Sequence, residues 1–165
     1  MNNQKGVGLI EVLVALILLA IAVLGFTALQ VRAISASIDA GNTTQATSLA
    51  KDLAERIRIN RDGYAVYTAT STYTGGASSK DCASVICTAS EMAQFDFDQV
   101  DRRATNLGMD VAINDCQGST LSRKCIYVAW DTTTATNGTA APSCTNGTAY
   151  ITGAKCIIME IYNYG

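Results

Sequence analysis

Six cysteines are the side chains of this sequence with the most distinctive chemistry. All of them lie beyond residue 81, and histidine is absent from the whole chain. A zinc site would therefore need four thiolates, and no C-x-x-C pair is present to supply them. We expect disulfides, with no metal and no cofactor. Disulfides persist in oxidising compartments, so this part of the chain is expected in a periplasm or outside the cell.

Six cysteines allow fifteen pairings, and sequence alone does not choose among them. Sequential pairing is preferred because each pair then closes a short loop next to a predicted strand or helix. The preferred pairs are Cys82 with Cys87, Cys116 with Cys125, and Cys144 with Cys156.

Glu11 is the other side chain whose position calls for chemistry. It stands directly before Val12 to Val31, twenty residues that carry no charge. A carboxylate at the edge of hydrocarbon costs about 2.5 to 3.5 kcal/mol or more, unless it is protonated, reaches the interface or pairs with a cation. We therefore expect Glu11 to lie in the headgroup layer or to pair with a positive group.

Catalytic patterns are missing from the sequence. There is no histidine base, no G-x-S-x-G and no Walker-type loop. The carboxylates of Asp96, Asp98 and Asp101 would spread over different faces of a helix, so we expect them to be exposed to solvent. The sequence predicts that the chain is not an enzyme, and a membrane-anchored enzyme is kept only as an alternative.

Nucleic-acid binding is not indicated by the charge. Beyond Asn60 the chain has seven Lys or Arg against ten Asp or Glu, a net charge of −3. General nucleic-acid binders carry a basic surface, so no nucleic-acid partner is expected. Two basic pairs are interpreted as solvated surface residues: Arg102 with Arg103, and Arg123 with Lys124.

The uncharged run after Glu11 has the length and composition of a membrane-spanning helix. At about 1.5 Å per residue, twenty helical residues cover about 30 Å, the thickness of a bilayer's hydrocarbon core. The run is apolar on every face, although a buried core helix is an alternative. A removable secretory signal is rejected because no small-x-small cleavage site follows the run.

Beyond Arg32 the apolar residues narrow to a single stripe, which predicts an amphipathic helix. No proline interrupts residues 7 to 60, so one continuous helix is possible, with a weak point at Gly41-Asn42 and an end at Asp62-Gly63. The stripe consists of Ala46, Leu49, Leu53 and Ile57.

The rest of the chain predicts a small α+β head. We expect an exposed loop over residues 64–80, a helix capped by Ser90 and running to Asn106, and strands at 109–113, 125–133, 149–152 and 155–164. At least one of the pairs Asn137-Gly138 and Asn146-Gly147 should form a tight turn. The expected core contacts of the helix are Met92, Phe95, Val100 and Leu107. The long helix would cover one face of the antiparallel sheet without a further layer, through Val128, Trp130, Ile157 and Ile161.

The residues around Glu11 also resemble a known family. Gly6, then Val7-Gly8-Leu9-Ile10-Glu11, is similar to the class III signal of type IV pilins and pseudopilins. Gly25, Leu29-Gln30 and the stretch from Leu49 to Asn60 most resemble PilV-type minor pilins. Val7 and Gly8 depart from the usual Phe and Thr. The resemblance implies cleavage by a prepilin peptidase after Gly6, methylation of Val7, and pairing of Glu11 with the terminal amine of a neighbouring subunit.

The resemblance implies the type IV pilin fold, a long N-terminal helix packed on a small antiparallel sheet with a disulfide-bonded head. The expected parts are a leader over residues 1–6, a transmembrane or filament-core helix over 7–31, the amphipathic half of the same helix over 32–61, and a head over 62–165.

A minor pilin of a type IV pilus is the function that the resemblance implies, in a Gram-negative bacterium. It would sit in the inner membrane with a periplasmic head and then join an extracellular pilus, where it would help to initiate assembly and present a tip adhesin for adhesion and twitching motility. Its expected partners are the prepilin peptidase, other minor and major pilins, and a tip adhesin. The alternatives are a type II secretion pseudopilin and a DNA-uptake pilin.

Overall fold

The computed structural model describes residues 8–70, 72–76, 80–118 and 123–161. The predicted cleavage and methylation positions, Gly6 and Val7, lie outside the described residues. The chain divides into two compact units, Met1–Gly41 and Asn42–Gly165.

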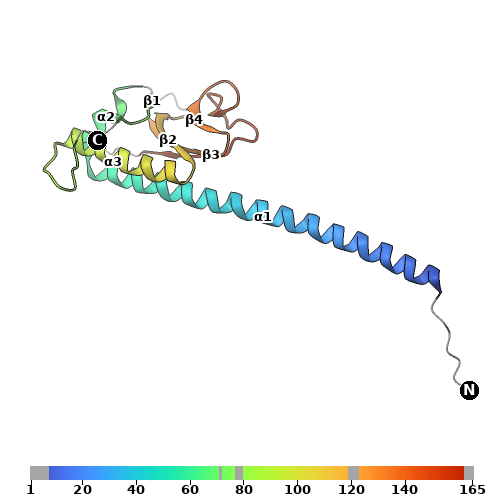
Figure 1. The fold of residues 1–165 in the computed structure, drawn as a ribbon. Helices are drawn as coiled ribbons and strands as arrows, with labels where there is room; N and C mark the ends of the chain where they lie inside the picture. Colours follow the sequence, from blue (N-terminus) through green and yellow to red (C-terminus); the bar gives the residue numbers. More distant parts are fainter. Residues whose placement is uncertain (1–7, 71, 77–79, 119–122, 162–165) are drawn as a thin grey trace, which may run out of the picture. The chain divides into compact units, whose positions relative to one another are not determined.

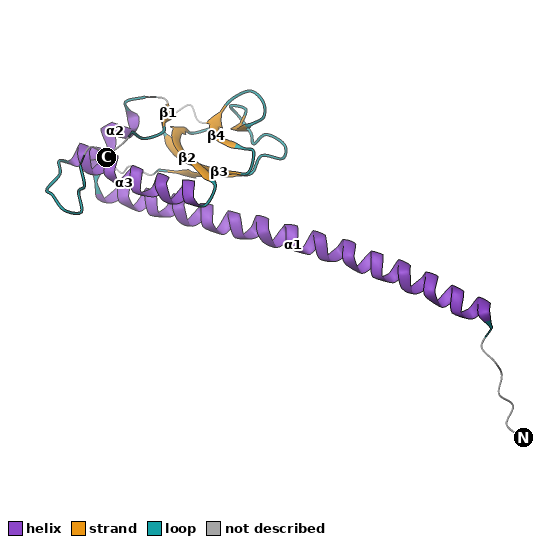
Figure 2. Cartoon of the chain, in the orientation of Figure 1, coloured by secondary structure: helices purple, strands orange, loops and turns teal. Residues whose placement is uncertain are grey.

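One helix, α1, runs from Leu9 to Ile59 (Figures 1 and 2). The prediction of a single uninterrupted helix is therefore confirmed, and α1 remains helical through Gly41 and Asn42, where the two units meet. It ends three residues before Asp62. A short 3₁₀ turn, η1 (Arg61–Gly63), follows.

A four-stranded antiparallel sheet forms the centre of the second unit (Figure 2). Its strands lie in the order β1-β2-β3-β6, and β2 and β3 are paired along seven residues each. The bounds are β1 (Thr72–Tyr73), β2 (Met109–Asp115), β3 (Lys124–Trp130) and β6 (Cys156–Glu160). The predicted strands starting near 109, 125 and 155 are confirmed, although Tyr164 lies outside the described residues.

The predicted strand at 149–152 is wrong, because this stretch contributes only an isolated bridge from Tyr150 to Thr145. The same region instead holds β4 (Thr134–Asn137) and β5 (Ser143–Thr145), which pair in parallel. A parallel pair cannot be closed by a two-residue hairpin at Asn137-Gly138. Asn146-Gly147 does turn the chain, since the Asn146 N–H donates to the carbonyl of Ala149 over 3.0 Å.

Helix α3 (Ala89–Asn106) has its cap two residues earlier than predicted. Thr88, and not Ser90, is the N-cap, because its hydroxyl accepts from the Glu91 N–H while its own N–H donates to the Glu91 carboxylate over 2.9 Å. This reciprocal arrangement satisfies two N–H groups at once.

The earlier start of α3 changes its buried face. Of the predicted core contacts only Val100 is buried, whereas Met92 and Phe95 are half-buried and Leu107 is exposed. The residues that α3 buries are Ala93, Phe97, Val100 and Ala104.

The prediction of an exposed loop over 64–80 is wrong for its first part. Residues 64–68 form the short helix α2 (Tyr64–Thr68), and Tyr67 is fully buried, its hydroxyl donating to the Ala93 carbonyl over 2.7 Å. Tyr73 in β1 packs edge-on against both Tyr67 and Phe97. Burial of these aromatic rings outweighs the turn-forming tendency of the Thr, Ser and Gly residues around them.

The main core lies between α1, α3 and one face of the sheet. The amphipathic stripe of α1 is buried as predicted, and Val128, Trp130 and Ile161 lie in the same cluster, with Ile157 partly buried against it. The architecture is thus the α+β arrangement expected from the sequence. The buried residues of α1 are Ala46, Leu49, Ala50, Leu53 and Ile57.

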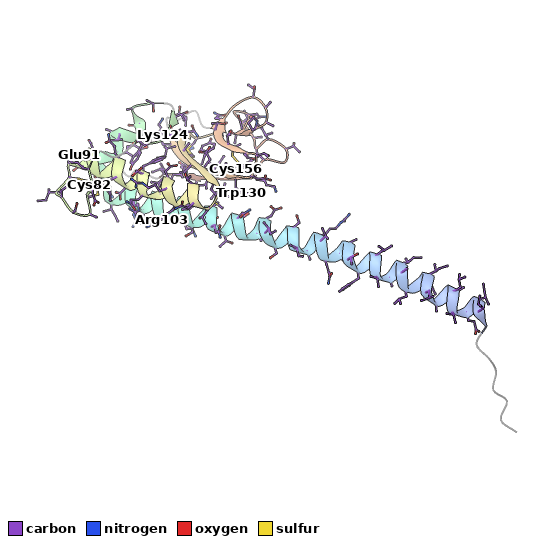
Figure 3. All side chains as sticks on the ribbon, viewed as in Figure 1. Cys82, Glu91, Arg103, Lys124, Trp130 and Cys156 are labelled. Atoms are coloured by element: carbon purple, nitrogen blue, oxygen red, sulfur yellow. A yellow bond between two sulfur atoms is a disulfide. The ribbon has the colours of Figure 1, made fainter. Side chains whose placement is uncertain are left out.

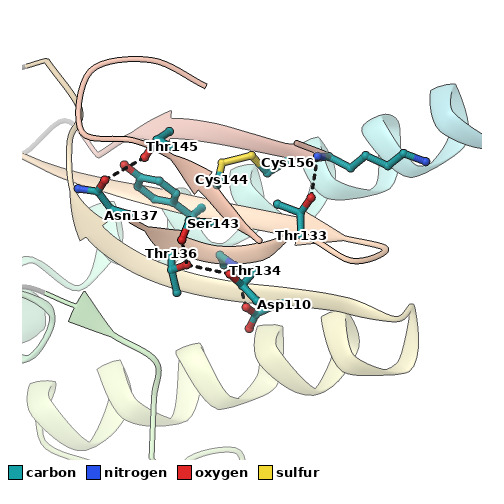
Figure 4. The surroundings of a disulfide bond; sticks show 12 residues. Asp110, Thr133, Thr134, Thr136, Asn137, Ser143, Cys144, Thr145 and Cys156 are labelled. Atoms are coloured by element: carbon teal, nitrogen blue, oxygen red, sulfur yellow. Dashed lines mark hydrogen bonds between the residues drawn. A yellow bond between two sulfur atoms is a disulfide. The ribbon is translucent and has the colours of Figure 1, made fainter. Parts of the chain in front are cut away.

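The opposite face of the sheet is also covered, which the sequence analysis did not expect. A second cluster includes Tyr127 and Ala129 of β3 with Ala135 of β4 and Cys144 of β5. Every residue of β3 is buried, so this strand lies at the centre of a layered head. Hydroxyl groups bind β4 to its surroundings, as between Thr136 and Ser143 (Figure 4).

Candidate functional site

The first part of α1 has an apolar surface that no other described residue of its unit, Met1–Gly41, covers. Every described residue from Gly8 to Ile38 is exposed (Figure 3). Among the described residues, one helix is long and apolar enough to cross a membrane by length and composition, with a mean hydropathy of 3.0 and no burial in its most apolar window. Because exposed apolar area costs roughly 25 cal/mol per Å² in water, lipid or other protein is expected to cover this surface.

Glu11 lies in the first turn of this apolar helix. Its Oε2 accepts a long hydrogen bond of 3.3 Å from the Gly8 N–H, and its own N–H donates to the Gly8 carbonyl over 3.0 Å. A carboxylate at a helix N-terminus is favoured by the helix dipole. A neutral N–H does not balance a full charge, so burial of this surface in an apolar environment would still require a cation beside Glu11.

The six cysteines form three disulfides in the sequential pairing that the sequence analysis preferred. Cys82–Cys87 closes a loop just before α3, with Cα atoms 5.6 Å apart. Cys116–Cys125 connects the end of β2 with β3, and Cys144–Cys156 connects β5 with β6 (Figure 4). No cysteine is free.

Two of the three head carboxylates considered for catalysis, Asp96 and Asp98, take part in ion pairs. Arg56 joins Asp52 (2.9 Å) to Asp96 (2.7 Å), and Asp98 pairs with Arg102. The expectation that these acids are exposed to solvent is wrong, because both are half-buried, and Asp96 lies against Arg56 of α1.

Asp101, the third of these acids, is also half-buried. Burial raises the pKa of its carboxyl, and the negative charges of Asp110 and Asp98 raise it further. Within the described part of the chain, no three metal-binding side chains come together.

Lys124 differs from the prediction of solvated basic pairs, whereas Arg102, Arg103 and Arg123 are exposed as predicted. Lys124 is buried, with its Nζ donating to the Thr70 carbonyl over 2.7 Å and pairing with Asp115 over 2.8 Å. Its neighbour Arg123 pairs with Glu160 over 2.6 Å. These lysine and arginine side chains are used to hold the strand ends together.

Arg103 extends from α3 to Asp52 of α1 over 2.9 Å, so it too has an internal partner. The basic residues of α3 are thus engaged in contacts within the head.

Two family models match the chain on adjoining segments. The prokaryotic N-terminal methylation motif matches residues 1–27, and the model described as Type IV pilin Tt1218 matches residues 28–98. The chain is a type IV pilin-like protein. None of the curated proteins and none of the solved structures compared with it matches.

This pilin is a structural subunit, and its methylation motif implies processing by a prepilin peptidase and association with other pilins. The same motif and the apolar segment of α1 indicate membrane anchoring and a location in a pilus. The matched segment 28–98 includes the amphipathic stripe, the Cys82–Cys87 loop and the first part of α3.

One feature of the head surface was missed by the sequence analysis. Val85 and Ile86 stand at the tip of the Cys82–Cys87 loop, and Ile86 is 98% exposed. The sequence did hold a signal for this exposed tip, because Val85 and Ile86 are two apolar β-branched residues between cysteines only five positions apart. A loop so short has no room to bury these side chains.

Proposed function

We propose that this pilin is a PilV-type minor pilin of a type IV pilus, which helps to initiate assembly and to present a tip adhesin for adhesion and twitching motility. The observation that carries the proposal is the exposed apolar surface of α1 with Glu11 at its start, in a segment that matches the methylation motif. The likeness of Leu29-Gln30 and of residues 49–60 to PilV-type proteins supports the finer assignment.

In this proposal the chain is first a membrane protein and then a subunit of the pilus. In the first state, residues 7–31 span the inner membrane once, with residues 32–61 and the head 62–165 in the periplasm. The peptidase removes residues 1–6 by cleaving after Gly6, and Val7 is methylated. In the second, the apolar helix leaves the bilayer for the core of an extracellular filament, where the chain lies at the tip.

Glu11 would select correct stacking in that core. Its carboxylate is proposed to pair with the terminal amine of a neighbouring subunit, which supplies the cation that an apolar environment requires. A buried ion pair adds little net stability, but an unpaired buried charge is strongly unfavourable. Subunits that fail to align the two groups would therefore be rejected.

Substitution of Gly6 and of Glu11 tests these two steps separately. Gly6→Val is expected to leave the chain uncleaved in the membrane, as seen by its mass, and full cleavage would contradict the assigned site. Glu11→Val is expected to insert and be cleaved, yet to be absent from sheared pili; Glu11→Asp, which keeps the charge, serves as its control. Normal amounts of Glu11→Val in the pili would refute the pairing.

A type II secretion pseudopilin would share the same processing signal and helix. Deletion of the gene separates the two functions, since loss of surface pili with normal protein secretion supports the pilus. Loss of secretion with normal pili would reverse the assignment.

A further inference from the structure

The sequence Thr-Asn-Gly-Thr-Ala occurs twice in the head, at residues 136–140 and 145–149. Each copy contains an Asn-Gly pair, in which the asparagine side chain is open to attack by the next backbone nitrogen because glycine has no Cβ to block the approach. The two copies have the same nearest neighbours, so they should react similarly in an unfolded chain. A difference in reactivity between Asn137 and Asn146 in the folded head would therefore come from the fold.

Strand pairing holds the first copy in an unreactive arrangement. Asn137 is the last residue of β4, and its side-chain oxygen accepts from the Thr145 hydroxyl over 3.2 Å (Figure 4). The nitrogen that would have to attack belongs to Gly138, and its N–H donates to the Thr145 carbonyl over 2.9 Å. A Cβ added at Gly138 would clash with the Ser143 side chain, so this backbone is closely packed and has little room to rearrange. Reaction at Asn137 would first require this hydrogen bond to break.

The second copy lies on an exposed turn directly after β5. Residues 146–149 are all exposed, so water and dissolved bases reach the Asn146 side chain. Within the described part of the chain, the Gly147 N–H makes no hydrogen bond. The Gly147 nitrogen is thus available for reaction, whereas the Gly138 nitrogen in the first copy is not.

Three donors surround the side-chain oxygen of Asn146. The Thr148 N–H, the Ala149 N–H and the Thr148 hydroxyl donate to Oδ1 over 3.2, 3.0 and 3.3 Å. The ring closed by the first of these bonds contains both Cγ of Asn146 and the Gly147 nitrogen, so the two reacting atoms are held near each other. When the nitrogen attacks Cγ, negative charge develops on Oδ1. The same donors would stabilise that charge, as the donors of an oxyanion hole do.

We propose that Asn146 is a site of deamidation in the folded head, and that Asn137 in the identical pentapeptide is protected. The Gly147 nitrogen bonds to Cγ of Asn146, the side-chain amide leaves as ammonia with the proton from Gly147, and a cyclic imide remains. Water then opens the imide at one of its two carbonyls, which gives aspartate, or isoaspartate with one more carbon in the main chain. Either product adds a negative charge to the exposed turn, so the head becomes more acidic as the chain ages.

Mass spectrometry of the full-length chain in detergent tests this selectivity. One sample is incubated in mildly alkaline buffer with its disulfides intact, and a second is reduced and denatured in guanidinium before the same incubation. Digestion at acidic pH limits further reaction, and fragment ions assign the mass gain to Asn137 or Asn146. In the folded chain Asn146 should deamidate at least about tenfold faster than Asn137, since the two sites differ by more than one hydrogen bond. In the denatured chain the two rates should agree within about twofold, because the neighbours are the same.

Matched substitutions in the two copies test the role of the donors. Thr148→Pro removes a backbone N–H and a hydroxyl from Oδ1 of Asn146, so the ratio of its folded to its denatured rate should fall by about three- to tenfold. Thr139→Pro is the equivalent change in the first copy. It removes no described hydrogen bond to Asn137 and should leave the ratio at that site unchanged. Both threonines are exposed, and a non-reducing gel checks that the three disulfides form.

Equal rates at the two sites of the folded chain, or a faster reaction at Asn137, would overturn the proposal. An unreacted Asn146 after the denatured chain has deamidated would also overturn it, because the three donors would then protect the amide. A rate difference of the same size in folded and denatured chains would assign the selectivity to sequence and not to the fold. An unchanged ratio in Thr148→Pro would contradict the role of the donors. None of these outcomes depends on the proposed function.

Discussion

The two parts of α1 should respond in opposite ways to the same substitution. Leu53 is completely buried in the main core, whereas Leu29 on the same helix is 68% exposed. Replacing a buried leucine with alanine removes apolar contacts and leaves a cavity, which costs about 2 to 5 kcal/mol. The same change at an exposed helical site costs less than about 0.5 kcal/mol, because alanine is at least as good a helix former.

The expected change in melting temperature follows from the size of the head. For a unit of this length, a loss of about 3 kcal/mol lowers the Tm by on the order of 10 °C. Trp130, the single tryptophan of the chain, is 7% exposed in the same core, so its fluorescence in detergent reports unfolding of the head. Leu53→Ala should shift this transition strongly, and Leu29→Ala should leave it within about 2 °C.

Equal effects at the two positions would refute the division of α1 into a head-packing part and a part that awaits other molecules. A negligible effect of Leu53→Ala alone would show that the stripe is not the basis of head stability. Incorporation into pili offers the reverse readout, because only the exposed part of α1 is proposed to enter the filament core.

Two further perturbations concern the head. Gly75 has a φ of +79°, and a Cβ added there would lie 2.6 Å from the Phe97 ring, so Gly75→Ala should lower the free energy of unfolding in urea by about 1 to 3 kcal/mol. At Gly76 an added Cβ would have nothing within 4 Å, so Gly76→Ala should lower it by less than about 0.5 kcal/mol. Equal losses for the two variants would contradict the close approach of Gly75 to Phe97. The hydrogen bond from Lys80, followed by that from the Thr88 N–H, lowers the pKa of Glu91 to about 2. The contribution of the ionised Glu91 to the stability of the head should therefore be complete above about pH 4.5 and be lost as the pH falls through about 2. An NMR titration of the Glu91 carboxyl with a midpoint near 4.5 would contradict the cap.

Local patterns in the sequence were sufficient to predict the long helix and its buried stripe. An unbroken apolar run followed by spacings of three and four residues specifies α1 without reference to the rest of the chain. The strands β2, β3 and β6 were predicted for the same reason, because alternation or an apolar run marks each one. The disulfide pairing agreed with a preference for short loops.

The errors arose where distant residues decide the structure. Tyr67 and Tyr73 lie in a stretch with the composition of a loop, but Tyr73 packs against both Tyr67 and Phe97 of α3, and Tyr67 is buried. The parallel pairing of β4 with β5 depends on a partner strand rather than on the Asn-Gly turn signal. Burial of Lys124 follows from the Thr70 carbonyl, which no local pattern places beside it.

The functional residues show the same contrast. Glu11 could be singled out because a charge at the edge of an apolar run is anomalous in any structure, whereas the terminal amine as its partner is implied only by the family resemblance. The exposed apolar tip at Ile86 was not predicted, although the shortness of the Cys82–Cys87 loop was a local signal for it.

The covered far face of the sheet has a consequence for how the head matures. Apart from Tyr127, that face holds mainly alanines and cysteines, and two of the three disulfides lie there. The helix-covered face is built from large apolar side chains, whose burial requires no oxidant. A newly made chain under reducing conditions would thus complete one face of its head and leave β4 and β5 weakly held. Folding of a reduced chain is then expected to proceed with hydrophobic assembly of the helix-covered face first and oxidative closure of the far face second.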